Sequence, residues 1–153
     1  MMKKPSQRKL RQPRKQNSIA AAMDFLAHRN HSEKELRQKL LRKFEEKDVL
    51  KALDYCREQN WLFRPEALSE QTMNALHRRK KGFLFIQRYL RQKGLPVPSK
   101  NPEIEEEKAR ELLGRKFNSV RDFPVKQKAH RFLKSRGFED EVIRRVLYAN
   151  DRS

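Results

Sequence analysis

The chain has one cysteine, Cys56, and four glycines among its 153 residues. A single cysteine cannot form an internal disulfide bond or supply a thiolate metal cluster, which is typical of a protein from a reducing compartment. No apolar run approaches the roughly 18 residues needed to cross a bilayer, and no apolar stretch of a signal peptide follows the basic N-terminus. We therefore expect a cytoplasmic protein that does not enter a membrane.

Signals for catalytic, nucleotide and metal sites are also missing. The pair Lys81-Gly82 lacks the upstream glycine and the following serine or threonine of a phosphate-binding loop. His28 and His31 are three residues apart, but they flank the predicted end of a helix, where a solvated turn explains them better than a metal site. Cys56 falls on the inward face of a predicted helix, so we expect a buried apolar residue rather than a nucleophile. We predict no catalytic residue, no metal and no cofactor.

Acidic residues are few compared with basic ones. Lysine and arginine number 38 and aspartate and glutamate 20, which gives a formal net charge of +18. Such a charge favours a polyanionic partner, or an assembly that contains a polyanion. Residues 1–17 carry seven of the cations, two prolines, no acid and almost no apolar side chain. We predict that they form a disordered basic tail.

From residue 18 onward, apolar residues recur at spacings of three and four, which predicts helices and no strands. Three stretches of this pattern, at 36–44, 86–95 and 129–138, resemble one another, and each is a short basic helix with one apolar stripe. Their spacing of about 45 to 50 residues indicates one helical unit used three times. We therefore predict an all-α protein built from tandem three-helix repeats in an elongated, curved array.

Local signals place the repeats at 18–62, 63–102 and 103–150. Ser32 and Glu35 have the spacing of a capping box at a helix start. Gly94 and Gly137 occupy the positions of left-handed residues that end a helix. Three prolines between 96 and 102 prevent a continuous helix there, so the second repeat is expected to have a truncated third helix.

The second helix of each repeat is basic on its outer face. In a linear array such faces can line up along one edge, which suits a phosphate backbone or a filament surface better than a compact ligand. Four consecutive cations also end the first helix of the second repeat, where they complement its dipole. The candidate binding surface consists of Arg37, Lys39, Arg42, Lys43, Arg78, Arg79, Lys80, Lys81, Arg88, Arg91, Arg131, Lys134 and Arg136.

Three blocks of the sequence resemble the RecX family, regulators of the RecA recombinase. The blocks are Phe25-Leu-Ala-His-Arg-Asn-His-Ser-Glu-Lys-Glu-Leu-Arg-Gln-Lys-Leu40, Gly82-x-x-x-Ile86-x-x-x-Leu90-x-x-x-Gly94 and Lys126-x-Lys-x-x-x-Phe132-Leu-x-x-Arg-Gly-Phe138. The resemblance extends, with gaps, over residues 19–148. It implies a helical-repeat protein that binds RecA filaments on DNA, lies in the helical groove across neighbouring protomers, and modulates strand exchange, ATP hydrolysis and coprotease action.

The middle repeat departs from the family pattern. Members usually carry an aromatic-Leu-Asp-Asp stretch followed by Phe-Ala, whereas this chain reads Trp61-Leu-Phe-Arg-Pro-Glu-Ala-Leu68. The family's arginine before the middle repeat falls near Leu76, and its Gly-Tyr-Gly is reduced to Lys80-Lys81-Gly82. These departures favour the first and third repeats as the working surface.

Two functional hypotheses follow. The first, implied by the resemblance, is a monomeric, non-enzymatic regulator that binds the RecA filament and its single- or double-stranded DNA and inhibits the recombinase, ATPase and coprotease activities of RecA. The second is a stand-alone DNA- or RNA-binding protein, similar to an RNA chaperone, that does not depend on RecA. A member of the family that folds but no longer regulates is a third alternative. None of them requires a membrane or a small-molecule substrate.

Overall fold

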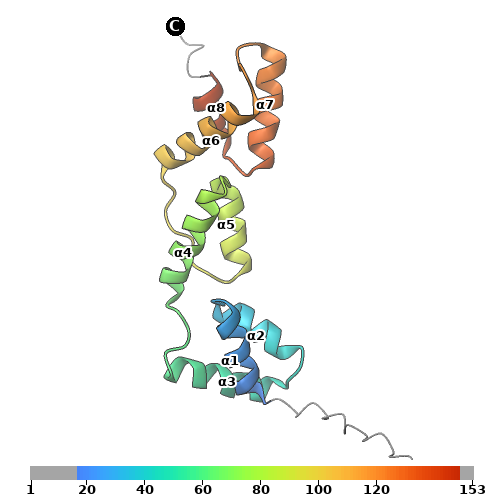
Figure 1. The fold of residues 1–153 in the computed structure, drawn as a ribbon, viewed down its shortest axis with the longest axis vertical. Helices are drawn as coiled ribbons and strands as arrows, with labels where there is room; N and C mark the ends of the chain where they lie inside the picture. The colour runs from blue at the N-terminus through green and yellow to red at the C-terminus, as the bar shows by residue number, and fades with distance from the viewer. Residues whose placement is uncertain (1–16, 149–153) are drawn as a thin grey trace, which may run out of the picture.

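The computed structural model describes residues 17–148, and this part of the chain contains helices and no strand. All but one residue of the predicted basic tail therefore lies outside the described residues. The helices gather in three groups that follow one another along the long axis of the molecule (Figure 1). The helices are α1 (Ser18–His28), α2 (Glu33–Leu41), α3 (Glu46–Glu58), α4 (Pro65–Arg78), α5 (Phe83–Gln92), α6 (Pro102–Lys116), α7 (Phe123–Ser135) and α8 (Asp140–Tyr148).

Each group of helices has its own hydrophobic core. The first core, from α1 to α3, includes the fully buried Leu40 and Cys56. The second, from α4 and α5, is centred on the fully buried Ile86, and the third, from α6 to α8, includes Leu133 and Phe138. Because each unit buries its own apolar stripe, the molecule is a short array of helical repeats. The predicted all-α repeat architecture is confirmed.

The middle unit has two helices, and residues 93–101, which connect α5 to α6, form no helix. Prolines in this connection remove backbone donors and clash with a helical path. The connection instead follows α4, where the buried Ser69 hydroxyl donates to the carbonyl of Pro96 at 2.6 Å. An extended segment therefore covers part of the face that α3 and α8 cover in the outer units.

Four helices end in the same type of turn. The residue after the helix cap is left-handed at Asn60, Lys80, Gly94 and Gly137, with φ of 56°, 58°, 68° and 89°. In each case the next amide donates to the carbonyl five residues earlier, at 2.9 to 3.2 Å, which is the Schellman arrangement. The prediction at the two glycines is confirmed, and the turns at Asn60 and Lys80 are additional.

The second helices of the three units meet end to end. The Ser32 hydroxyl at the start of α2 donates to the carbonyl of Lys93 after α5, at 2.5 Å. The Gly82 amide at the start of α5 donates to the carbonyl of Arg136 after α7, at 2.9 Å. Figure 1 shows α2, α5 and α7 following one another along the same side of the molecule. A partly negative helix end thus faces a partly positive one at both junctions.

Candidate interaction surface

Exposed cations lie on each of the three helices in this row. The apolar stripe of each of α2, α5 and α7 faces the core of its own unit. The cations on the opposite side of each helix therefore face outward. Five of the predicted surface cations on these helices, or directly after α2, are exposed, and their side chains form no hydrogen bond or ion pair with another residue between 17 and 148. We call them the cationic track: Arg42, Lys43, Arg88, Arg91 and Arg131.

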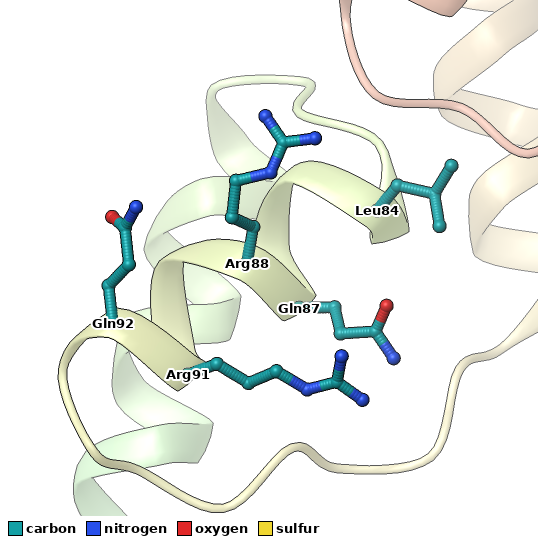
Figure 2. Close-up of a pocket in the computed structure, with 5 residues that line it drawn as sticks. All are labelled: Leu84, Gln87, Arg88, Arg91 and Gln92. Atoms are coloured by element: carbon teal, nitrogen blue, oxygen red, sulfur yellow. The ribbon is translucent and has the colours of Figure 1, made fainter.

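The middle of the track forms a shallow groove of about 500 Å³ on α5. Its lining residues are Leu84, Gln87, Arg88, Arg91 and Gln92, and Figure 2 shows the Gln87 and Arg91 side chains extending from the same side of the helix. Helix α5 contains no acidic residue, so neither guanidinium is neutralised from its own helix. Arginine forms paired hydrogen bonds with phosphate or carboxylate groups, while Leu84, 42% exposed, offers apolar contact. The groove suits an anionic macromolecular surface.

Three of the predicted surface cations form ion pairs within the chain. Arg37 lies 2.9 Å from Glu46, Lys80 lies 2.6 Å from Glu111, and Lys134 lies 3.6 Å from Asp140. These pairs are at least partly exposed, and such pairs contribute little to stability, so an anionic partner can replace the acid. Until a partner replaces it, the acid in each pair reduces the local positive charge.

Three other predicted surface cations pack against aromatic rings. Lys39, Lys81 and Arg136 lie 5.1, 4.8 and 5.3 Å from the centre of a phenylalanine ring. The Lys39 ammonium is also 2.8 Å from Nε2 of His31. Burial, together with the charge of nearby Arg29, lowers the pKa of Lys39 below its ordinary value. These three side chains stabilise the fold, and only part of each is available to a partner.

The cation run at the end of α4 is divided by the structure. Arg78 and Arg79 are exposed, and their guanidinium groups have no hydrogen-bond or ion-pair partner within the described part of the chain. Lys80 and Lys81 instead turn toward the third unit, where Lys80 pairs with Glu111 and the carbonyl of Lys81 accepts a hydrogen bond from Lys108. Helix α4 is not part of the end-to-end row, so Arg78 and Arg79 lie outside the cationic track.

Sequence reasoning missed two sets of residues. Leu84, Gln87 and Gln92 line the groove but carry no charge, and their only signal is helical spacing relative to Arg88 and Arg91. Glu105 and Lys108 form an ion pair that is almost fully buried between the second and third units. Its spacing of three residues resembles that of an ordinary surface pair, so the sequence does not distinguish it.

Metal binding and thiol chemistry find little support between residues 17 and 148. Between residues 17 and 148 no group of three or more histidine, cysteine or acidic side chains is placed to hold a metal ion. Cys56 is a buried free thiol, and burial raises its pKa, which disfavours the reactive thiolate. In the same range no helix has the length and apolar character needed to span a membrane.

Comparisons with known proteins identify the family. Residues 19–56 match the first three-helix domain of RecX, and residues 103–147 match the third. The chain is 35% identical to the regulatory protein RecX of Cronobacter sakazakii, over 84% of this chain and 88% of that protein. It is 32% identical to that of Haemophilus influenzae, over 84% and 91%. The crystal structure of RecX from Lactobacillus salivarius has the same fold, with a TM-score of 0.74 at 18% identity over 88% of this chain and 94% of that one. The chain belongs to the RecX family.

Proposed function

We propose that this chain binds RecA filaments assembled on DNA and inhibits the recombinase, ATPase and coprotease activities of RecA, with no catalytic step of its own. Membership of the RecX family, whose relatives are named regulatory proteins, supports a regulatory role. The observation that carries the proposal is the cationic track, because its members lie on or directly after the second helix of each unit and those helices run end to end.

The mechanism follows from the shape of the array. A filament presents the same surface at regular intervals, and an array of linked units can contact several of those surfaces at once. Each contact raises the effective concentration of the next, so weak electrostatic contacts combine into tight binding. A rod that bridges adjacent protomers opposes the relative movements that turnover requires. In this mechanism the chain inhibits RecA by bridging its protomers, so the chain itself needs no pocket that binds ATP or DNA bases.

The direct test is a titration of DNA-dependent ATP hydrolysis by RecA. We expect substoichiometric amounts of the full chain to lower the rate, because one array contacts more than one protomer. A parallel titration of a chain without residues 1–17 measures what the basic N-terminal segment adds. No inhibition at a large excess of the protein in moderate salt would contradict the proposal.

A matched pair of variants tests the cationic track. Arg88→Gln with Arg91→Gln removes two charges from the groove on α5, whereas Arg78→Gln with Arg79→Gln removes two exposed charges from α4, outside the track. We expect the first pair to weaken filament binding by about tenfold and the second pair to have a smaller effect. Equal losses would show that only total charge matters.

The net charge of +18 favours a second candidate function, which is binding to nucleic acid without RecA. Binding to naked single-stranded DNA, to RNA and to RecA-coated DNA should be compared at the same salt concentration. Preference for the coated filament supports regulation of RecA. Equal affinity for coated and naked strands supports the stand-alone function, with an affinity for the naked single strand that falls with salt at a slope of about −0.7 per phosphate contacted.

A further inference from the structure

The first turn of α5 is capped by the third unit of the array. The opening amides of a helix have no acceptor inside their own helix. Here three consecutive amides at the start of α5 each donate to an acceptor from the third unit, at 2.9 Å. The pairs are Gly82 to the carbonyl of Arg136, Phe83 to a carboxylate oxygen of Glu105, and Leu84 to the carbonyl of Gly137.

The acceptor from α6 is a buried carboxylate. The Glu105 side chain is 2% exposed and forms an ion pair with Lys108, which is 4% exposed. The Lys108 ammonium also donates to the carbonyl of Lys81 at 2.7 Å and lies 2.8 Å from Nδ1 of His77. The negative charge of Glu105 thus lies at the positive end of α5, and its charge is balanced inside the junction. Neither Glu105 nor Lys108 belongs to the hydrophobic core of the third unit.

Gly82 allows this close approach. Its backbone has φ of −73° and ψ of 162°, an extended conformation that any residue adopts. A Cβ atom at this position would lie 2.3 Å from the carbonyl carbon of Gly137 and 2.4 Å from the amide nitrogen of Phe138. Both contacts are with backbone, which cannot rotate away as a side chain can. Gly82 is therefore required by the neighbouring unit rather than by its own conformation.

The junction between the first and second units is built differently. It uses the Ser32 hydroxyl and an ion pair between Glu35 and Lys93, whose side chain is 28% exposed. A Cβ atom on Gly94 would lie 2.7 Å from Cδ and 2.9 Å from Cβ of Lys34, so its nearest contacts would be with a side chain rather than with backbone. The first junction therefore relies on side chains, whereas the second joins backbone to backbone around a buried charge.

We propose that Gly82 and Glu105 are positioning residues that lock the third unit onto the second. They hold Arg88 and Arg91 at a set separation from Arg131 on α7, whereas within residues 17–148 each hydrogen bond between the first and second units involves a side chain. The locked junction is a property of this chain by itself. Its effect on filament binding rests on the proposed function, because a fixed separation of cations matters only for a partner whose surface repeats at fixed intervals.

Hydrogen exchange of the unmodified protein gives the first test. The amides of Phe83 and Leu84 should exchange slowly, because they donate to the third unit. The amides of Glu66 and Ala67, in the first turn of α4, have no side-chain cap and should exchange fast. Equally fast exchange in both first turns would overturn the proposal.

Two glycine variants give the second test. Gly82→Ala places a methyl group in the junction, whereas Gly114→Ala on α6 is the control, because no atom lies within 4 Å of its Cβ position. Spin labels at the exposed positions Asn74 and Gln127 report the separation of the second and third units in a Cys56→Ala background. We expect one narrow distance distribution for the parent and the control and a broad one for Gly82→Ala, with helix content unchanged. A narrow, unchanged distribution for Gly82→Ala would overturn the locked junction.

Glu105→Ala provides an independent variant if Gly82→Ala fails to fold. It leaves the Phe83 amide and the Lys108 ammonium without their anionic partner in a buried site. Because burying these groups unpaired is costly, the junction should open so that water hydrates both. We expect fast exchange at Phe83 and a broad distance distribution, while the core of the third unit stays intact. A slow Phe83 amide in this variant would contradict the role given to Glu105.

Filament binding then tests the consequence. We expect Gly82→Ala to bind RecA-coated DNA about tenfold more weakly than Gly114→Ala, while affinity for a short naked oligonucleotide stays equal. Equal filament binding with an open junction overturns the positioning role. If the unmodified chain does not bind the filament at all, the proposed function fails, whereas the exchange and distance measurements still decide whether the junction is locked.

Discussion

Glu35 on α2 joins the first and second units, and Glu35→Gln tests how much its charge contributes. The carboxylate is 11% exposed and accepts hydrogen bonds from Arg29 at 2.8 Å and from Lys93 at 2.9 Å. It also completes the capping box by accepting from the Ser32 amide. Glutamine keeps the size of the side chain but removes the charge. The variant therefore measures the electrostatic contribution with little change in packing.

The magnitude follows from the pKa of the carboxyl group. Burial alone would raise the pKa of Glu35, but the hydrogen bonds from Arg29 and Lys93 outweigh burial and lower it from 4.5 to about 2. Because the folded pKa is the lower one, the charge stabilises the fold above the unfolded pKa. This stabilisation is lost as pH falls from about 4.5 through about 2. The pKa difference corresponds to at most about 3 kcal/mol, and solvent screening around the half-exposed Arg29 reduces this to about 1–2 kcal/mol.

Urea unfolding followed by circular dichroism measures the effect. At pH 7 we expect Glu35→Gln to be less stable than the parent by about 1–2 kcal/mol. At pH 2.5 the difference should be much smaller, because most of the stabilisation from this charge is lost once the pH falls well below the unfolded pKa of about 4.5. Glu70→Gln is the control, since Glu70 is exposed and has no ion pair within the described residues. If the parent and Glu35→Gln have the same stability at both pH values, the assigned role of Glu35 is wrong.

Three further substitutions test the local arguments. Lys80→Gly should raise the melting temperature in thermal unfolding, because a left-handed lysine backbone costs about 1 kcal/mol. Loss of the ion pair with Glu111 offsets only part of this gain in stability, so a lower melting temperature would contradict the prediction. Leu133→Ala removes a fully buried side chain and should cost about 3 kcal/mol in urea unfolding, whereas Leu84→Ala, at an exposed position, should cost less than about 1 kcal/mol. Ser32→Ala should lower stability by about 1 kcal/mol and speed amide exchange at the start of α2, and unchanged exchange there would refute the capping role.

Helix starts and ends were predictable from the sequence where one residue type performs the local chemistry. The capping box at Ser32 and the left-handed glycines at 94 and 137 are present, because both depend on a few neighbouring residues. The turns at Asn60 and Lys80 were not predicted, since neither is glycine. Lys80 lies in the turn from α4 to α5, and its side chain pairs with Glu111 of the third unit, a tertiary contact that the local sequence does not reveal.

Periodicity was less reliable for individual side chains than for whole helices. Helical spacing groups Leu41 with Leu40 and Leu50 with Val49, but Leu41 and Leu50 are 42% and 45% exposed. In a short repeat each helix is covered by only a few neighbours, so the buried stripe is narrower than the apolar stripe in the sequence. Exposed leucines of this kind cannot be told from core leucines by spacing alone.

The cations of the candidate surface were predictable from the sequence, but the sequence did not show which of them are free to bind a partner. Arg37 pairs with Glu46 across two helices, and Lys80 pairs with Glu111 from another unit, so neither pairing follows from spacing within one helix. The sequence shows which helices are basic, because the apolar stripe fixes the outward face. Which guanidinium groups lack an acidic partner depends on how the helices pack, and this required the structure.

The end of α2 that points away from α5 is built differently from the ends of α5 and α7. At both junctions the receiving surface is a left-handed glycine turn, after α5 and after α7. Helix α2 has no such turn, because its cap, Arg42, keeps a helical φ of −68° and the Phe44 amide donates back to Leu40 at 2.9 Å. The left-handed turn that α2 and α5 meet at their own starts is therefore not repeated after α2. Arg42 and Lys43, which follow the last residue of α2, are exposed and have no side-chain partner within residues 17–148, so they remain available to a partner with negative charge.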